Sequence, residues 1–271
     1  MRFFTEPVFG LAALLLVAGG IVMQIFTILS GAIHSSPINQ FYFLQAGTNG
    51  IANARNPSRW TFFAVCGQDP SSGHNANCGA VVPALPFDPP RNFGTTENVP
   101  QQFVGTHMYF YLSRFMFAFY LIALFFAACA LFTGLLALCS RLGGYLSGLT
   151  VSIALFFQAL AASLLTYVAT TSLSFSPWHT KLTHPSAWVI KGRNAFRSAG
   201  LEASIGRYLL AFAWASFACF LIATVLFCLG GALGGDRSSG VSRRRSTKSN
   251  RSRASFMDTD SQRRVKDDYS A

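Results

Sequence analysis

The chain has 271 residues, of which 51% are hydrophobic and only 11% are charged, and its formal net charge is +11. An ordinary soluble domain contains about 25% charged residues, so the composition argues against a soluble enzyme and against a free nucleic-acid-binding protein. Nearly half of the lysines and arginines follow residue 236, which leaves the rest of the chain strongly apolar. We therefore expect an integral membrane protein that binds no nucleic acid.

Four long apolar windows organise the chain. A helix needs roughly 20 mainly apolar residues to cross a hydrocarbon core of ~30 Å, and each window meets this requirement without Asp, Glu, Lys, Arg or His. The windows are Val8–Ile33, Phe115–Cys139, Leu149–Leu173 and Tyr208–Leu233. The first is longer than the ~7–15-residue apolar region of a signal peptide, which favours a retained span over cleavage near Ser30-Gly31-Ala32.

These windows divide the chain into segments with a predicted orientation. We expect an N-terminal segment at 1–7, spans at 8–33, 114–140, 149–173 and 208–233, outer loops at 34–113 and 174–207, a cytoplasmic turn at 141–148, and a basic disordered tail at 234–271. The side with both termini and the turn carries 12 Lys and Arg, against nine in the outer loops. Because cytoplasmic segments near spans are enriched in Lys and Arg, both termini are predicted to be cytoplasmic.

The first outer loop is predicted to be β-rich. It contains eight of the eleven prolines, which disfavour long helices. Segments Phe41–Leu44 and Trp60–Cys66 are rich in aromatic and β-branched residues and are predicted as short strands. The second outer loop contains a basic stretch from Lys191 to Arg197, which suits either wall polymer or lipid headgroups.

The six cysteines fall into two groups. Cys66 and Cys78 are the only ones in the outer loops, and an isolated pair in an exported loop is expected to form a disulfide. His74 and Asp69 lie between them, so a metal site is the alternative, although it needs a further ligand with matching geometry. The other four, Cys129, Cys139, Cys219 and Cys228, are expected to be packing residues within the spans. The alternative is S-palmitoylation of Cys139 or Cys228.

The predicted spans carry little that could perform chemistry. They lack the ionisable residues that mark proton relays and ion-coupled transport, which argues against a pump or a secondary transporter. Gln24 and Gln158 are expected to hydrogen-bond to neighbouring helices, and a pore-lining role is the alternative. Two glycine pairs with a spacing of four residues favour close helix packing and helix termination, or lateral self-association: Gly230 with Gly234, and Gly231 with Gly235.

The sequence shows no nucleophile elbow, phosphate-binding loop or metal-binding histidine pattern, so we expect no enzyme, cofactor or metal. All five histidines lie in the outer loops: His34, His74, His107, His179 and His184. Ordinary loop residues are the simpler interpretation. An external pH sensor is the alternative, because His titrates near neutral pH.

The tail contains a basic cluster after the last span: Arg243, Arg244, Arg245, Lys248, Arg251 and Arg253. Such clusters attract anionic lipid headgroups at ~1 kcal/mol per residue, although the same charges can also serve only to fix the topology. Ser246 and Ser252 lie within the cluster, and phosphate there would add up to about two negative charges per site. We therefore expect a lipid-binding tail that phosphorylation weakens.

Several short segments resemble known tetraspan families. Four spans with Trp60 upstream of Cys66 and Cys78 resemble the claudin-like superfamily, although the spacing differs and the Gly-Leu-Trp triplet is absent. Further segments are similar to the fungal Sur-seven/PalI family: 41–45, 58–61 with Arg59 and Trp60, 86–94, 111–115, and the block Lys191, Gly192, Arg193 and Asn194. The resemblance covers the chain from residue 1 to about 235 and leaves the tail unmatched.

The resemblance implies an all-α membrane fold, in which a claudin-like bundle of four transmembrane helices carries a small β-rich extracellular subdomain from the first outer loop. We expect Trp60 to pack over the disulfide and to help hold the sheet on the bundle. Members of the eisosome-associated branch are fungal plasma-membrane proteins of static cortical patches, implicated in endocytosis, sphingolipid balance and cell-wall organisation. The resemblance thus predicts a structural tetraspan protein that organises such a microdomain.

The expected partners follow from this interpretation. They are membrane lipids, including sphingolipid or sterol, further copies of the chain, other microdomain membrane proteins and the cell wall. The alternative function is an accessory membrane protein in ambient-pH sensing, to which the PalI branch is similar, or in calcium signalling. A membrane-embedded lipid-modifying enzyme is less suited to the sequence, because no paired catalytic residues lie at the membrane face.

Overall fold

The computed structural model describes residues 5–137, 141–166 and 188–233 of the chain. The chain separates into two units, Met1–Ala232 and Leu233–Ala271, and the first holds the helices and strands described below apart from the last residue of α6. The predicted basic tail and the segment 167–187 lie outside the described residues.

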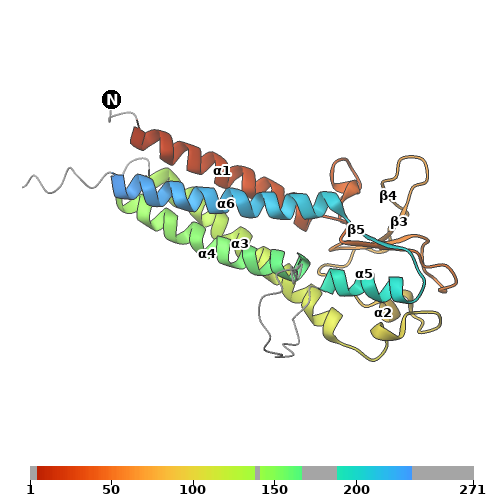
Figure 1. Ribbon diagram of the computed structural model, residues 1–271. Helices are drawn as coiled ribbons and strands as arrows, with labels where there is room; N and C mark the ends of the chain where they lie inside the picture. Colours follow the sequence, from red (N-terminus) through yellow and green to blue (C-terminus); the bar gives the residue numbers. More distant parts are fainter. Residues whose placement is uncertain (1–4, 138–140, 167–187, 234–271) are drawn as a thin grey trace, which may run out of the picture. The chain divides into compact units, whose positions relative to one another are not determined.

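Four long helices lie side by side in the first unit (Figure 1): α1 (Thr5–Ile28), α3 (Met108–Ala137), α4 (Arg141–Thr166) and α6 (Arg207–Leu233). Each contains a stretch long and apolar enough to cross a membrane: Val8–Ile28, Met108–Leu136, Gly143–Leu165 and Arg207–Gly230. Large apolar side chains on these helices remain exposed, for example Phe132 at 69%, which suits a surface that contacts lipid. The predicted bundle of four apolar spans is confirmed.

The helices differ from the predicted spans at three places. α1 ends at Ile28 rather than at residue 33, and the chain turns at Gly31, which has a φ of +81°. α3 begins at Met108, before the predicted start at residue 114. Residues 141–148, predicted as a turn, form the beginning of α4. The glycines of this segment would weaken a helix in water. In lipid, however, the backbone has to satisfy its own hydrogen bonds, and a helix satisfies them within the segment.

Small residues allow the four helices to approach closely. A Cβ on Gly20 of α1 would lie 2.6 Å from the ring of Phe220 in α6, and one on Gly134 of α3 would lie 2.5 Å from Leu14 in α1. Fully buried alanines fill the same layer of the bundle: Ala13, Ala127, Ala130, Ala154 and Ala223. Close backbone approach supplies the van der Waals contact that holds helices together in lipid.

One chain of hydrogen bonds joins all four long helices. Gln24 of α1 donates from Nε2 to the carbonyl oxygen of Tyr120 in α3 at 2.9 Å and to Oε1 of Gln158 in α4 at 3.1 Å. Gln158 donates from Nε2 to the carbonyl oxygen of Ala213 at 3.1 Å and to Oγ of Ser216 at 2.7 Å, both in α6. The side chains of Gln24, Gln158 and Ser216 are fully buried. The two polar span residues singled out by the sequence therefore face each other inside the bundle.

A five-stranded antiparallel sheet lies at the end of the bundle where α1 ends and α6 begins, here called the loop-side end (Figure 1). The strand order is β4-β3-β2-β1-β5. Its strands are β1 (Leu44–Ala46), β2 (Ser58–Trp60), β3 (Val65–Gln68), β4 (Asn75–Ala76) and β5 (Ala203–Ile205). Short helices accompany it: η1 (Ile38–Gln40), α2 (Pro89–Phe93), η2 (Gln101–Phe103) and α5 (Trp188–Ser198).

The predicted strands agree only in part with the observed ones. Residues 60–66 were expected to form one strand but form a hairpin, in which β2 ends at Trp60 and β3 begins at Val65. Oγ1 of Thr61 holds the turn, because it accepts a hydrogen bond from the N–H of Ala64 at 3.0 Å and donates to its carbonyl oxygen at 2.7 Å. This turn contains no Gly, Pro or Asn, so its composition resembles that of a strand. Of residues 41–44, only Leu44 lies in β1.

The sheet is not built from the first outer loop alone, which corrects the predicted origin of the subdomain. β5 comes from the second loop and pairs with β1, with Ser204 opposite Gln45. Gly206 then joins β5 directly to α6, and its N–H donates to the carbonyl oxygen of Phe43 at 3.1 Å. A Cβ at residue 206 would lie 1.7 Å from the carbonyl oxygen of Tyr42, so only glycine permits this junction.

Replacing Gln158 with Leu should destabilise the bundle, because it removes the bonds to Gln24, Ala213 and Ser216 while nearly conserving side-chain volume. Interhelical hydrogen bonds in membranes are worth about 0.6–2 kcal/mol, so we expect the free energy of unfolding in bicelles to fall by about 1–2 kcal/mol. Ser163→Ala is the matched control, since Ser163 is exposed on the same helix and bonds to Leu160 there. An unchanged free energy for Gln158→Leu would contradict a stabilising role.

Candidate functional site

Trp60 is the centre of an aromatic cluster on the face of the sheet that lies toward α2 and α5, here called the aromatic face. Its side chain is 1% exposed, and its ring centroid lies 5.1 Å from that of Phe87, 5.8 Å from Phe93 and 5.5 Å from Phe196. Its Nε1 donates a hydrogen bond to Oδ1 of Asn92 at 3.0 Å. Three segments that lie far apart in the sequence therefore meet around this one side chain.

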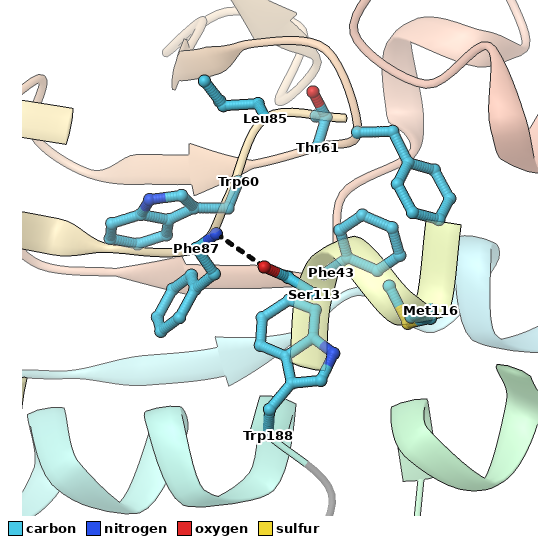
Figure 2. Close-up of a pocket in the computed structure, with 9 residues that line it drawn as sticks. Phe43, Trp60, Thr61, Leu85, Phe87, Ser113, Met116 and Trp188 are labelled. Atoms are coloured by element: carbon cyan, nitrogen blue, oxygen red, sulfur yellow. Dashed lines mark hydrogen bonds between the residues drawn. The ribbon is translucent and has the colours of Figure 1, made fainter. Parts of the chain in front are cut away.

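The cluster continues to α3 and to the beginning of α5 (Figure 2). The N–H of Phe87 donates to Oγ of Ser113 at 3.0 Å, and the ring of Phe87 lies 5.0 Å from that of Trp188. Nε1 of Trp188 is buried without a hydrogen-bond partner among the described residues. The enclosed cavity measures only about 10 Å³, roughly the minimum for one water molecule. This region is therefore a packing core that has no room for a substrate.

The predicted disulfide between Cys66 and Cys78 is confirmed. It closes a loop with a sequence separation of 12 that contains β4. The metal alternative finds no support in the described part of the chain, where no group of three His, Cys, Asp or Glu side chains could hold an ion. Asp69 instead accepts hydrogen bonds from Ser72 and Ser71, which lower its pKa to about 2.

Trp60 does not pack over the disulfide, contrary to the prediction. The register places Trp60 opposite Val65 and Arg59 opposite Cys66. Residues opposite each other in an antiparallel pair point to the same face of the sheet, and successive residues point to opposite faces. Arg59 and Cys66 therefore share the second face of the sheet, here called the polar face, while Trp60 lies on the aromatic face.

Arg59 is a buried cation on the polar face. It is only 4% exposed, and its guanidinium donates to Oε1 of Gln45 at 2.8 Å, to the carbonyl oxygen of Gly73 at 2.8 Å and to Oδ1 of Asn75 at 3.2 Å. The guanidinium carbon also lies 4.4 Å from the ring centroid of Tyr42. Burial lowers the pKa of Arg59 from its ordinary value. No carboxylate pairs with it within the described residues, where the one ion pair joins Arg91 and Asp88.

Two grooves border the polar face. One measures about 490 Å³ and is lined by residues of η1, β1, β2, β3, β5, the segment 72–74 and the start of α6. The other measures about 980 Å³ and shares Gln45, Gln68 and Ser204 with the first. The sequence did not identify Gln45, Gln68 and Ser204 as groove residues. Only the strand register shows that these residues, which come from three strands, share a face.

The predicted block in the second loop lies in α5 and is unevenly buried. Gly192 is buried against Phe87 and Leu44, whose atoms a Cβ would meet at 3.2 and 3.3 Å. Asn194 is exposed, Lys191 and Arg193 are partly buried, and Arg193 donates from Nε to Oδ1 of Asn194 at 3.3 Å. One residue of the block is therefore buried, and the others reach solvent to different degrees.

The remaining predicted residues are placed as follows. A Cβ on Gly230 of α6 would lie 4.0 Å from Phe9 of α1, so this glycine faces a neighbouring span of the same chain. Gly231 belongs to α6, whereas Gly234 and Gly235 lie outside the described residues, as do Cys139 and the tail residues Arg243, Arg244, Arg245, Ser246, Lys248, Arg251, Ser252 and Arg253. Cys228 is exposed on α6, and Cys129 and Cys219 are partly buried.

Three of the four spans, strands β1 to β4 and the Cys66–Cys78 disulfide lie within a family match over residues 9–178, to the SUR7/PalI family, whereas β5 and α6 follow the matched residues. The chain belongs to the SUR7/PalI family. It is a multi-pass membrane protein, as the family match and the four apolar helices together show. Arg59, Trp60 and both disulfide cysteines lie within the matched residues.

The chain is similar to several fungal proteins. Protein SUR7 of Candida albicans is 38% identical over 227 residues, which cover 83% of this chain and 75% of that protein. Protein SUR7 of Saccharomyces cerevisiae is 32% identical over 213 residues, which cover 78% of this chain and 64% of that protein. An uncharacterized plasma membrane protein of the same yeast, YNL194C, is 34% identical over 151 residues, or 55% of this chain and 50% of that protein. No solved structure matches the chain.

Removing the disulfide should loosen the subdomain. Closing a loop of this length is worth roughly 3 kcal/mol in the chain-entropy model, so we expect the double variant Cys66→Ser/Cys78→Ser to lose roughly that amount of unfolding free energy. Limited proteolysis of the purified protein should then cut residues 65–79 faster. Cys228→Ser, which changes an exposed cysteine of α6, should leave the cleavage rate unchanged. Equal rates for both variants would contradict the prediction.

A methyl group at residue 192 should also destabilise the protein. Gly192→Ala places a Cβ 3.2 Å from the ring of Phe87 and 3.3 Å from Leu44, and overpacking of this kind costs about 1–3 kcal/mol. Thermal unfolding in detergent should show a lower midpoint. Gly19→Ala is the matched control, because nothing lies within 4 Å of a Cβ there. A midpoint for Gly192→Ala that is as high as that of the control would show that α5 can shift to accept the methyl group.

Proposed function

We propose that the protein is a structural tetraspan that organises a static plasma-membrane microdomain of the eisosome type. The observation that carries the proposal is membership of the SUR7/PalI family together with a bundle whose spans contain no Asp, Glu, Lys, Arg or His between Val8 and Ile28 or between Phe115 and Leu136. The interior of the bundle contains closely packed small and large apolar residues, and the hydrogen bonds of Gln24 and Gln158 cross it. Such a bundle is suited to holding a fixed shape in the membrane.

The proposed location is the plasma membrane, with both termini in the cytoplasm and the sheet on the outer side. Support for this orientation comes from the disulfide on the loop side, because disulfides form and persist in oxidising compartments. The excess of basic residues on the other side agrees with it. The name of the similar yeast protein supports the choice of membrane.

The proposed partners occupy different parts of the chain. Anionic headgroups of the cytoplasmic leaflet suit the basic tail, with Ser246 and Ser252 as the residues whose phosphorylation would weaken that attraction. Further copies of the chain and other microdomain proteins suit the exposed apolar surfaces of the spans. The cell wall suits the sheet and the exposed residues of α5. Through these contacts the protein would influence endocytosis, sphingolipid balance and wall integrity.

A C-terminal fluorescent fusion, followed by photobleaching recovery in living cells, tests the proposal. We expect static cortical patches that do not recover on the time scale in which a freely diffusing plasma-membrane protein with the same tag recovers. A second fusion that ends at residue 236 asks whether the basic tail is needed for the patches. Uniform fluorescence that recovers freely would contradict the microdomain proposal, and an accessory role in pH or calcium signalling would then be the better hypothesis.

A further inference from the structure

The groove of about 490 Å³ beside the polar face, here called the α6 groove, has an unusual charge balance. Arg59 and Arg207 contribute two permanent cations, whereas none of its lining residues is Asp or Glu. The other polar side chains that line it are neutral amides, hydroxyl groups and one histidine: Gln40, Tyr42, Gln45, Gln68, Ser72, His74, Ser204 and Tyr208. A polar site with cations and no carboxylate favours an anionic ligand that also accepts hydrogen bonds.

Arg59 gives the α6 groove a cation that no carboxylate of the described residues pairs with. Its Nε and Nη1 atoms donate to neutral acceptors, and Nη2 makes no hydrogen bond to any described residue. A buried charge is costly unless it is paired, and a guanidinium presents donors in a fork that matches phosphate oxygens. Its three hydrogen bonds and the contact with the ring of Tyr42 already fix the side chain, so little conformational entropy is lost when a ligand binds.

The start of α6 adds to the positive potential. Arg207 is its first residue, and the first intrahelical backbone bond runs from the N–H of Leu210 to the carbonyl oxygen of Gly206. The first N–H groups of a helix lack intrahelical acceptors and form its positive end. In the α6 groove this helix end therefore acts together with the two arginines.

The position of the α6 groove along the chain decides between a dissolved anion and a lipid. Arg207 and Tyr208, which line it, are also the first two residues of the apolar span Arg207–Gly230. Tyr and Arg at the end of a span lie at the level of lipid headgroups, and Tyr208 is 58% exposed there. The groove therefore borders the headgroup layer on the loop side of the membrane.

We propose that the α6 groove binds the phosphate of an anionic lipid headgroup in the leaflet on the loop side. Arg207 and Nη2 of Arg59 contact the phosphate, while the amides of Gln45 and Gln68 bond to hydroxyl groups of the headgroup. This proposal is independent of the one made for the basic tail, and binding in the groove does not require that the protein form a microdomain.

Lipid binding by the full chain in nanodiscs tests the proposal. The probe is fluorescent phosphatidylinositol in a background of phosphatidylcholine, and native mass spectrometry counts the retained lipid. One Lys or Arg near an anionic membrane surface contributes about a fivefold change in affinity, so Arg207→Gln should weaken retention by about that factor. Arg114→Gln is the matched control, because Arg114 is an exposed arginine at the loop-side end of α3 that stacks on Phe110 outside the groove.

A second variant keeps the test decisive if one arginine contributes little. Ser204 is exposed on β5 and lines the groove, so Ser204→Glu places a carboxylate there and should reduce retention without disturbing the core. Unchanged retention in both Arg207→Gln and Ser204→Glu would overturn the proposal. An equal loss in Arg114→Gln would also overturn it, because the attraction would then be a general surface effect.

Two soluble competitors distinguish other ligands. Inorganic phosphate that displaces the fluorescent lipid at low concentration would overturn the assignment to a lipid and indicate a site for dissolved anions. A neutral oligosaccharide that displaces it would indicate a glycan site and would equally overturn the proposal. Retention that resists both competitors and falls in Arg207→Gln and Ser204→Glu is the expected result.

Discussion

The contact on which the rest of the protein depends is the insertion of the β2–β3 turn into the loop-side end of the helix bundle. The ring centroid of Phe62 lies 4.5 Å from that of Phe43, 5.2 Å from Phe117 and 5.7 Å from Tyr120. Strands of two to four residues cannot hold a sheet together in water by their own hydrogen bonds, so the burial of Phe62 attaches the sheet to α3. The carbonyl oxygen of Tyr120 also accepts the hydrogen bond from Gln24. The aromatic core of the subdomain and the polar chain between the spans are therefore one continuous structure.

The features that could be predicted from the sequence are those that depend on a short stretch of chain and not on its packing against the rest of the protein. A long stretch without charge can be buried in lipid whatever its neighbours are, which is why all four spans were recognised. The disulfide was recognised because only Cys66 and Cys78 lie in the loops. The position of Trp60 relative to that disulfide depends instead on strand register, and a shift of one residue reverses every side chain. A composition rich in aromatic and β-branched residues could not show that Thr61–Ala64 turns the chain.

The strand contributed by the second loop could not be predicted from the sequence for a different reason. β5 has only three residues, Ala203–Ile205, which is too short for an alternating pattern to be recognised. It becomes a strand because Gly206 brings it directly from α6 to the edge of β1, where Ser204 lies opposite Gln45. The polar face and its grooves exist only once this pairing has formed. Arg59 was selected by resemblance, but nothing in its sequence neighbourhood showed that it would be buried without a carboxylate.

The walls of the α6 groove connect membrane composition to the stability of the sheet. They come from η1, β1, β2, β3, the segment 72–74, β5 and α6, so the groove is complete only while β5 pairs with β1. A ligand that binds only the assembled groove stabilises the assembly by an amount that rises with its concentration relative to the dissociation constant, and the coupling is reciprocal. Headgroups bound at Arg207 would thus strengthen the β1–β5 pairing, and through Gly206 the junction with α6. A sheet that itself lies outside the apolar spans can in this way respond to the lipids around them.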